Sequence, residues 1–259
     1  MRIAPTLLPD GAMTAQAGRW PSGMASVDAA LGGGLAYGRV HEIYAAEAGD
    51  AGAAGGFAAA LAAGMGQARC ATALWLRTQR AVWLGGQFQA NGWADLGGSP
   101  GAGLLGVVPD AMTLLRAAAD ALRCPALSVV IVEAWGVLRE LDLTASRRLA
   151  LAAEKSGVPL LLLRIDARPV PSAAQTRWQV AAAPSRALPG QAPGHPAFDI
   201  SLLRQKSGPC GLDWQVEWDR DRRKFRDATL SGAVVSVPAD RPPADAGSGF
   251  AQPDGRYAA

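Results

Sequence analysis

The stretch from Pro21 to Ala60 contains the residues whose types and spacing come closest to a site for phosphate chemistry. A Gly-rich approach, Leu31–Gly38, leads into a short apolar strand, Val40–Tyr44, and then into a loop of small residues, Ala45–Gly56. An Ala-rich helix follows. In such an arrangement the loop holds phosphate with backbone N–H groups at the positive end of the helix dipole. The stretch therefore indicates the entry to a nucleotide-binding α/β domain.

The loop itself lacks the side chains that this chemistry needs. A working phosphate-binding loop carries a Lys that neutralises phosphate charge and a Ser or Thr that coordinates Mg²⁺. No Lys, Arg, Ser or Thr occurs from Tyr44 to Ala58, and two carboxylates there would repel phosphate. We expect a flexible connector that preserves the strand-to-helix turn, with weak nucleotide binding through loop amides as the alternative. This degenerate nucleotide loop comprises Glu47, Gly49, Asp50, Gly52, Gly55 and Gly56.

Side chains for acid–base or metal chemistry are scarce elsewhere. Glu133 ends the apolar run Ser128–Glu133, where its carboxylate could hold Mg²⁺ through water or act as a solvated or structural group. The apolar strand Cys70–Leu76 continues into Arg77 without a nearby carboxylate. The three Cys include no C-x-x-C pair, and the two His lie far apart. We therefore predict no catalytic residue, no metal site, no cofactor and no enzymatic activity.

Basic residues of the second half of the chain are candidates for contact with DNA or a partner. They lie in a Pro-stiffened loop, Arg164–Gln175, on a late hairpin, and in the run Arg220–Arg226, where Phe225 could stack on a base. The alternative for that run is a solvated end neutralised by neighbouring Asp residues. The candidates are Arg164, Arg168, Arg204, Lys206, Arg222, Arg223, Lys224 and Arg226.

The elements that position these residues alternate between strand and helix. Wholly apolar strands separated by helices are typical of a parallel sheet covered on both faces. Two later strands joined by SGPCG form an antiparallel hairpin. Between the expected strands 70–76 and 104–108 lies an excursion, Arg77–Pro100, with Trp83, Phe88 and Trp93, which either packs against the core or offers an aromatic surface. The expected strands are 40–44, 70–76, 104–108, 127–132, 158–163, 176–182, 198–206 and 212–218; the expected helices are 23–31, 57–67, 109–123 and 143–156.

Length and composition fit one large domain with tails. The 259 residues are 49% hydrophobic, and the net charge of +3 is too mild to indicate nucleic acid by itself. We expect a leader at 1–20, a core domain at 21–220, and a basic run with a tail at 221–259 that is disordered from Pro238. No apolar run is long enough to cross a membrane, and the cysteines fit a reducing compartment. The expected location is the cytoplasm.

The run from Gly23 to Tyr44 resembles the entry to the core of the RecA/RadA/KaiC superfamily. The shared features are an Asp in the first helix, the glycines 32–34, Gly38, and the strand residues 42–44. The strand Ser128–Glu133 lies where that superfamily has its Walker B strand, and the hairpin Leu202–Gly211 is similar to its late core hairpin. The resemblance implies a RecA-like core, with a mostly parallel central sheet flanked by helices and an antiparallel C-terminal hairpin.

Within that superfamily the chain resembles the ImuA family, some members of which carry a SulA-like description. The matching segments are LWLR, ALRCPALSVVIVE, TRWQVAAAPS and VEWD, together with a RecA-like entry whose loop lacks Lys. The resemblance implies an accessory role in error-prone translesion synthesis after DNA damage. The implied partners are an ImuB-like Y-family polymerase homologue, RecA, and an error-prone replicative-type DNA polymerase, with weak or indirect contact to DNA. The alternatives are an ATP-dependent recombination mediator and a cell-division inhibitor.

Overall fold

A computed structural model describes residues 18–69 and 72–228. The strands are β1 (Arg19–Trp20), β2 (Leu35–Ala36), β3 (Val40–Ala45), β4 (Thr72–Thr78), β5 (Gly103–Val108), β6 (Leu127–Trp135), β7 (Leu160–Ile165), β8 (Thr176–Ala182), β9 (Ala197–Gln205), β10 (Leu212–Asp219) and β11 (Lys224–Asp227). The α-helices are α1 (Ala25–Ala30), α2 (Ala51–Arg69), α3 (Gln79–Gly85), α4 (Ala90–Asp95), α5 (Ala111–Ala121) and α6 (Leu143–Ser156). The short 3₁₀ helices are η1 (Ala48–Asp50), η2 (Pro100–Ala102) and η3 (Pro189–Gln191).

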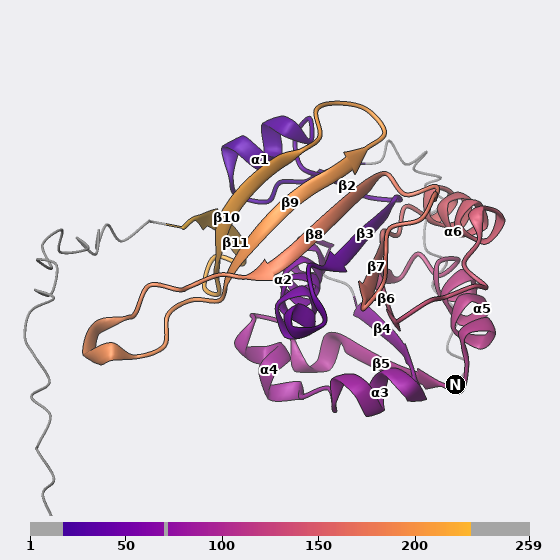
Figure 1. The fold of residues 1–259 in the computed structure, drawn as a ribbon, viewed down its shortest axis with the longest axis horizontal. Helices are drawn as coiled ribbons and strands as arrows, with labels where there is room; N and C mark the ends of the chain where they lie inside the picture. The colour runs from indigo at the N-terminus through magenta and orange to yellow at the C-terminus, as the bar shows by residue number, and fades with distance from the viewer. Residues whose placement is uncertain (1–17, 70–71, 229–259) are drawn as a thin grey trace, which may run out of the picture. The chain divides into compact units, whose positions relative to one another are not determined.

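A nine-stranded sheet organises the fold, in the order β11-β10-β9-β8-β3-β7-β6-β4-β5. The strands from β8 to β5 in this order run parallel, while β9, β10 and β11 continue the sheet as antiparallel neighbours (Figure 1). The expected α/β architecture with an antiparallel hairpin near its end is therefore confirmed. The central parallel strands β3, β6 and β7 are buried on both faces because helices cover both.

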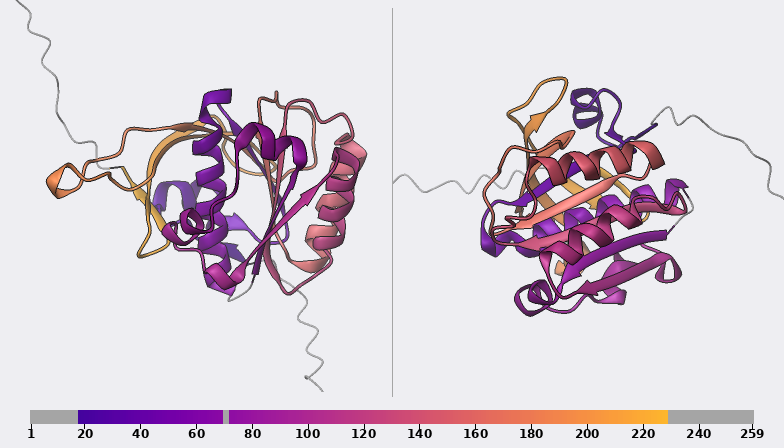
Figure 2. Two further views of the ribbon diagram at one scale, coloured as in Figure 1. Left: turned by 90° about the horizontal axis from the view of Figure 1, so that it is seen from below. Right: turned by 90° about the vertical axis from the view of Figure 1, so that its right-hand side faces the viewer.

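Two hydrophobic layers hold the helices to the sheet. On one face, α2 packs against the strands through a cluster that includes Ile43, Phe57 and Trp178. On the other face, α5 and α6 contribute Leu114 and Leu149 to a second cluster. Figures 1 and 2 show α2 on the opposite side of the central strands from α5 and α6. The carboxyl ends of β4, β6 and β7 lie next to the N-terminal half of α2.

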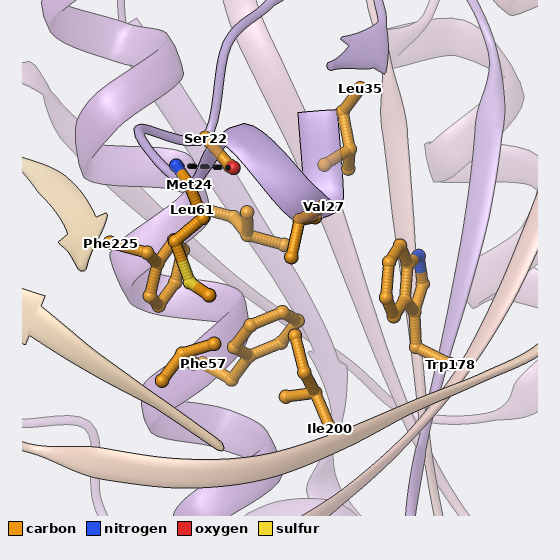
Figure 3. A pocket seen from close by; sticks show the side chains of 10 residues that line it. Ser22, Met24, Val27, Leu35, Phe57, Leu61, Trp178, Ile200 and Phe225 are labelled. Atoms are coloured by element: carbon orange, nitrogen blue, oxygen red, sulfur yellow. Dashed lines mark hydrogen bonds between the residues drawn. The ribbon is translucent and has the colours of Figure 1, made fainter. Parts of the chain in front are cut away.

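The entry segment packs onto α2 and the outer strands. Trp20 of β1 is buried. Gly34 has a φ of 114°, and its backbone passes directly against the Trp20 carbonyl. Figure 3 shows the apolar space that α1 closes against Phe57 and Ile200. Its volume of about 10 Å³ is too small for a ligand, so it is a packing defect of the core rather than a site.

Several sequence expectations are corrected by the structure. Ser26 is a possible helix cap by residue type, but the N-cap of α1 is Met24. Asp28 instead accepts hydrogen bonds from the backbone N–H groups of Ser22 at 2.7 Å and Gly23 at 3.3 Å. The helical spacing of Met112 and Leu115 in the expected helix 109–123 predicts that both face the core, but Met112 is 47% exposed. Phe225, a candidate for stacking on a base, is buried in β11.

The sheet extends beyond the expected core boundary at residue 220, since β11 pairs with β10. The expected tail from residue 238 and most of the expected leader lie outside the described residues. No helix in the described part of the chain is both long enough and apolar enough to cross a membrane.

Candidate functional site

The connection between β3 and α2 is shorter than expected. After Ala45 the chain forms η1, and α2 begins at Ala51. Glu47 and Asp50 make a reciprocal capping box that satisfies backbone N–H groups ahead of the helix. The glycines at 52, 55 and 56 therefore lie in the first turns of α2, which corrects the expectation of a flexible loop through residue 56. Gly49 lies in η1.

The carboxylate of Asp50 occupies the N-terminal end of α2. Its Oδ1 accepts a hydrogen bond from the backbone N–H of Ala182 in β8 at 2.9 Å, and its Oδ2 accepts one from Glu47 N–H at 3.3 Å. A negative group at this place is stabilised by the helix dipole, as an external phosphate would be. The chain thus places one of its own carboxylates at the end of the helix.

Glu133, two residues before the end of β6, accepts three side-chain hydrogen bonds. The indole of Trp75 donates to Oε2 at 3.0 Å, and Arg77 and the indole of Trp135 donate to Oε1, each at 2.8 Å. The side chains of Arg77 and Glu133 are 5% and 6% exposed. The carboxylate is therefore a buried acceptor, which corrects the solvated interpretation and leaves its oxygens engaged rather than free for a hydrated Mg²⁺.

Arg77 extends this network to the α3 region. One terminal nitrogen donates to the Ala81 carbonyl at 2.8 Å as well as to Glu133, and the other donates to the Gly86 carbonyl at 2.9 Å. Its Nε has no hydrogen-bond acceptor among the described residues. The arginine therefore links the ends of β4 and β6 to α3 while retaining one unused donor.

A cavity of about 360 Å³ lies beside this network. Its wall consists of the N-terminal half of α2, the ends of β4, β6 and β7, and the segment from Gly85 to Leu96. Open parallel sheets bind ligands in the crevice outside the carboxyl ends of their strands, which is where this cavity lies. Among the residues at 18–69 and 72–228, no group of three or more His, Cys, Asp or Glu could hold a metal ion.

Comparison with known proteins identifies the fold. No protein-family model matches the chain, and no curated protein matches it either. Among solved structures, the crystal structure of a RadB recombinase is similar, with a TM-score of 0.52 and 14% sequence identity over 80% of this chain and 99% of that chain. The fold is RecA-like. At this identity the similarity concerns architecture alone.

The RecA-like fold places the basic loop candidates differently. Arg164 lies inside β7 and is 3% exposed, with its Nη2 donating to the Gly136 carbonyl at 3.1 Å and its guanidinium 5.9 Å from the centre of the Tyr44 ring. Burial lowers the pKa of Arg164. This corrects the expectation that Arg164 offers a surface contact. Arg168 and Lys206 are exposed, as is Arg204, which donates to the Ser172 carbonyl at 3.3 Å.

The basic run after β10 is largely used within the fold. Arg226 donates to Glu217 at 2.8 Å, and Lys224 lies 4.6 Å from the centre of the Trp20 ring. Arg222 is exposed and lies 3.9 Å from a carboxylate oxygen of Asp219. Arg223 is partly buried in a positive-φ turn. Because Phe225 is also buried, base stacking by this run is excluded in the described conformation.

The aromatic excursion divides between core and surface. Trp93 is 7% exposed and donates from its indole to the Ser99 carbonyl at 3.1 Å, whereas Trp83 in α3 is 78% exposed. Phe88 lies between the rings of Trp75 and Trp93, at 5.4 and 6.5 Å between ring centres. Packing is therefore the correct interpretation for Phe88 and Trp93, and exposure is correct for Trp83.

His41 is a buried structural residue. Its Nε2 lies 2.9 Å from the Ala36 carbonyl, which can only accept, so Nε2 carries the proton. The Thr176 hydroxyl, 2.7 Å from Nδ1, therefore donates to the ring, and it accepts from the Trp178 indole at 2.9 Å. Burial lowers the pKa of His41 to about 4. The imidazole is thus neutral near pH 7 and fully engaged.

Sequence reasoning did not single out Trp75, Arg77 or Trp135 as site residues. A local signal was present, because side chains two apart on a strand share a face. Trp75 and Arg77 are so spaced on β4, as are Glu133 and Trp135 on β6. What the pattern could not supply was that β4 and β6 are neighbours in the sheet.

Proposed function

We propose that this chain is a non-catalytic accessory protein with a RecA-like fold, acting in an SOS-type response to DNA damage. It supports error-prone translesion synthesis by binding an ImuB-like Y-family polymerase homologue. RecA and an error-prone replicative-type polymerase are further proposed partners. The proposal includes no catalytic residue and no cofactor, and contact with DNA is weak or indirect.

One observation carries the non-catalytic part of this proposal. The polar groups around the β3–α2 connection and the end of β6 are bonded to other groups of the same chain. A phosphate at the α2 terminus would meet the Asp50 carboxylate, which already accepts from Ala182 and Glu47. A metal ion at Glu133 would have to replace three hydrogen-bond donors. Both changes oppose ATP binding and hydrolysis.

The partner assignment rests on the resemblance of the sequence to the ImuA family together with the RecA-like fold. Such a fold can be retained for its surfaces after its chemistry is lost, because fold and function are separable. Two adjacent apolar side chains of α3, Trp83 and Leu84, are 78% and 51% exposed. Contiguous exposed apolar groups are typical of sites that bind proteins.

A co-purification experiment tests the proposal. The full chain is immobilised and presented separately with the ImuB-like polymerase homologue and with RecA, each with and without ATP and Mg²⁺. We expect binding to at least one of them that does not depend on nucleotide. Failure to bind either partner removes the main support. DNA-stimulated phosphate release would favour the recombination mediator, and filamentous cells on overexpression would favour the division inhibitor.

A further inference from the structure

The strand β5 forms an unprotected edge of the nine-stranded sheet. It pairs with β4 on one side, and among residues 18–69 and 72–228 no strand pairs with its other side (Figure 1). Its sequence, GLLGVV, contains no charged residue and no proline. Edge strands of natural proteins commonly carry charges or proline, because their unpaired N–H and C=O groups otherwise pair with another strand. The edge at β5 lacks both of these barriers.

The other edge of the sheet, β11, shows the usual protection. Three of its four residues, KFRD, are charged, and its one apolar side chain, Phe225, is buried. On β5 the exposed side chains are instead apolar, since Leu104, Leu105 and Val107 are 56%, 44% and 45% exposed. Side chains of a strand alternate between the two faces of the sheet, so Leu105 and Val107 share one face and Leu104 lies on the other. A strand placed beside β5 would therefore bury apolar groups on both faces.

The apolar pattern of β5 is symmetric about Gly106. Leu104 and Leu105 precede this glycine, and Val107 and Val108 follow it. When two identical strands pair antiparallel about a two-fold axis perpendicular to the sheet, residues at equal distances from the axis oppose each other. With the axis at Gly106, Leu105 opposes Val107 of the second copy on one face, and Leu104 opposes Val108 on the other. The strand is thus complementary to a second copy of itself, because aliphatic pairs form on both faces and no like charges meet.

We propose that two copies of this chain associate through their β5 strands, paired antiparallel and centred on Gly106. The contact is isologous, so it closes at a dimer. A hollow of about 280 Å³ with an uncharged lining that includes Trp75, Trp93 and Leu105 borders the same edge. Val107 of the second copy, opposite Leu105, lies beside this hollow and reduces its exposure to water. The inference concerns self-association and does not rest on the proposed function.

Sedimentation velocity of the full chain tests the proposal. We expect the mass to rise from that of a monomer towards that of a dimer between about 1 and 100 μM, the range of a small interface. The double variant Leu105→Lys with Val107→Lys places like charges opposite each other across the axis, as does Leu105→Glu with Val107→Glu. Each double variant alone should therefore be monomeric, whereas their equimolar mixture should form a 1:1 dimer because opposite charges then face each other. Val137→Lys is the control, since Val137 is 84% exposed and lies outside β5.

Circular dichroism and thermal unfolding show whether each variant folds. Leu104→Lys, on the other face of the sheet, is a second edge variant and should weaken the dimer at least about tenfold. A wild type that stays monomeric up to about 100 μM, folded edge variants that associate as the wild type does, an equal loss of association in Val137→Lys, or a mixture that remains monomeric overturns the inference. Masses above that of a dimer also overturn it, because they require a heterologous contact, such as addition of residues 229–237 to β5 of another copy.

Discussion

Glu133→Gln is expected to destabilise the protein strongly, because the carboxylate is a buried acceptor for three donors. Glutamine keeps one oxygen and replaces the other with an NH₂ group, so one donor must face another donor. The change also leaves the Arg77 charge buried without its counter-charge, at a place where both side chains are at most 6% exposed. Breaking such a pair from one side costs about 3–5 kcal/mol.

The assay is urea unfolding followed by circular dichroism. With an m-value of about 3 kcal/mol/M, the midpoint should fall by about 1–1.7 M. The exposed pair of Asp120 and Arg123 supplies the matched control, since its side chains are 71% and 73% exposed and Asp120→Asn should change stability by at most about 0.5 kcal/mol. A double variant, Arg77→Met with Glu133→Leu, removes the unpaired charge but leaves two indole donors and two backbone carbonyls without their partners, so it should recover only part of the loss.

A cost below about 1 kcal/mol for Glu133→Gln would refute this reasoning. A carboxylate kept for metal binding or catalysis commonly reduces stability, so its neutralisation would leave the midpoint unchanged or raise it. The direction of the midpoint shift therefore separates a structural Glu133 from a functional one.

Three further changes test other parts of the fold. The pKa of His41 is lowered from 6.5 to about 4, so protonation of His41 disfavours the folded state. The free energy of unfolding should therefore fall by about 3 kcal/mol as the pH drops from about 6.5 to 4. In His41→Gln the urea midpoint should depend less on pH between pH 7 and 5. Gly55→Ala should raise the free energy of unfolding by about 0.5–1 kcal/mol. Gly34→Ala should lower it, because the backbone at Gly34 has a φ of 114°. Equal thermal midpoints for the two variants would contradict this expectation. Asp50→Ala removes the carboxylate that accepts from the Glu47 and Ala182 N–H groups and should cost about 1 kcal/mol by urea unfolding. An unchanged urea midpoint would contradict this structural role.

The sheet was accessible from sequence because most of its parallel strands are short apolar runs bounded by polar residues or glycine, while β8 shows an alternating pattern. The segment Thr176–Ala182 was expected as a strand and is β8, and Leu143–Ser156 was expected as a helix and is α6. In α6, Asp142 caps the N-terminus and Gly157 ends the helix with a φ of 77°. Local signals of this kind are readable without knowledge of the tertiary structure.

The site was less accessible because its contacts join distant parts of the chain. Arg77 and Glu133 are 56 residues apart, and their pairing depends on β4 lying beside β6. Asp50 contacts the backbone of Ala182, which is 132 residues away. That contact and the capping box allow α2 to start before Gly52, although glycine-rich sequence locally opposes a helix.

Arg164 is a second example of a side chain whose environment depends on residues distant in the sequence. An arginine after an apolar run usually marks the end of a strand, but here Gly136 supplies a carbonyl and Tyr44 a ring that accommodate the guanidinium inside the sheet. Neither neighbour is visible in the local sequence. The surface contacts that sequence suggested are thus reduced to side chains that remain exposed, among them Arg168, Arg204 and Lys206.

Isothermal titration calorimetry of the full chain with ATP and Mg²⁺ tests the central claim most directly. The claim is that a RecA-like fold is retained while the groups around its β3–α2 connection and Glu133 are bonded internally. We predict no saturable heat of binding at micromolar to high-micromolar ATP, under conditions in which circular dichroism shows a folded protein. A stoichiometric titration with micromolar affinity would contradict the account.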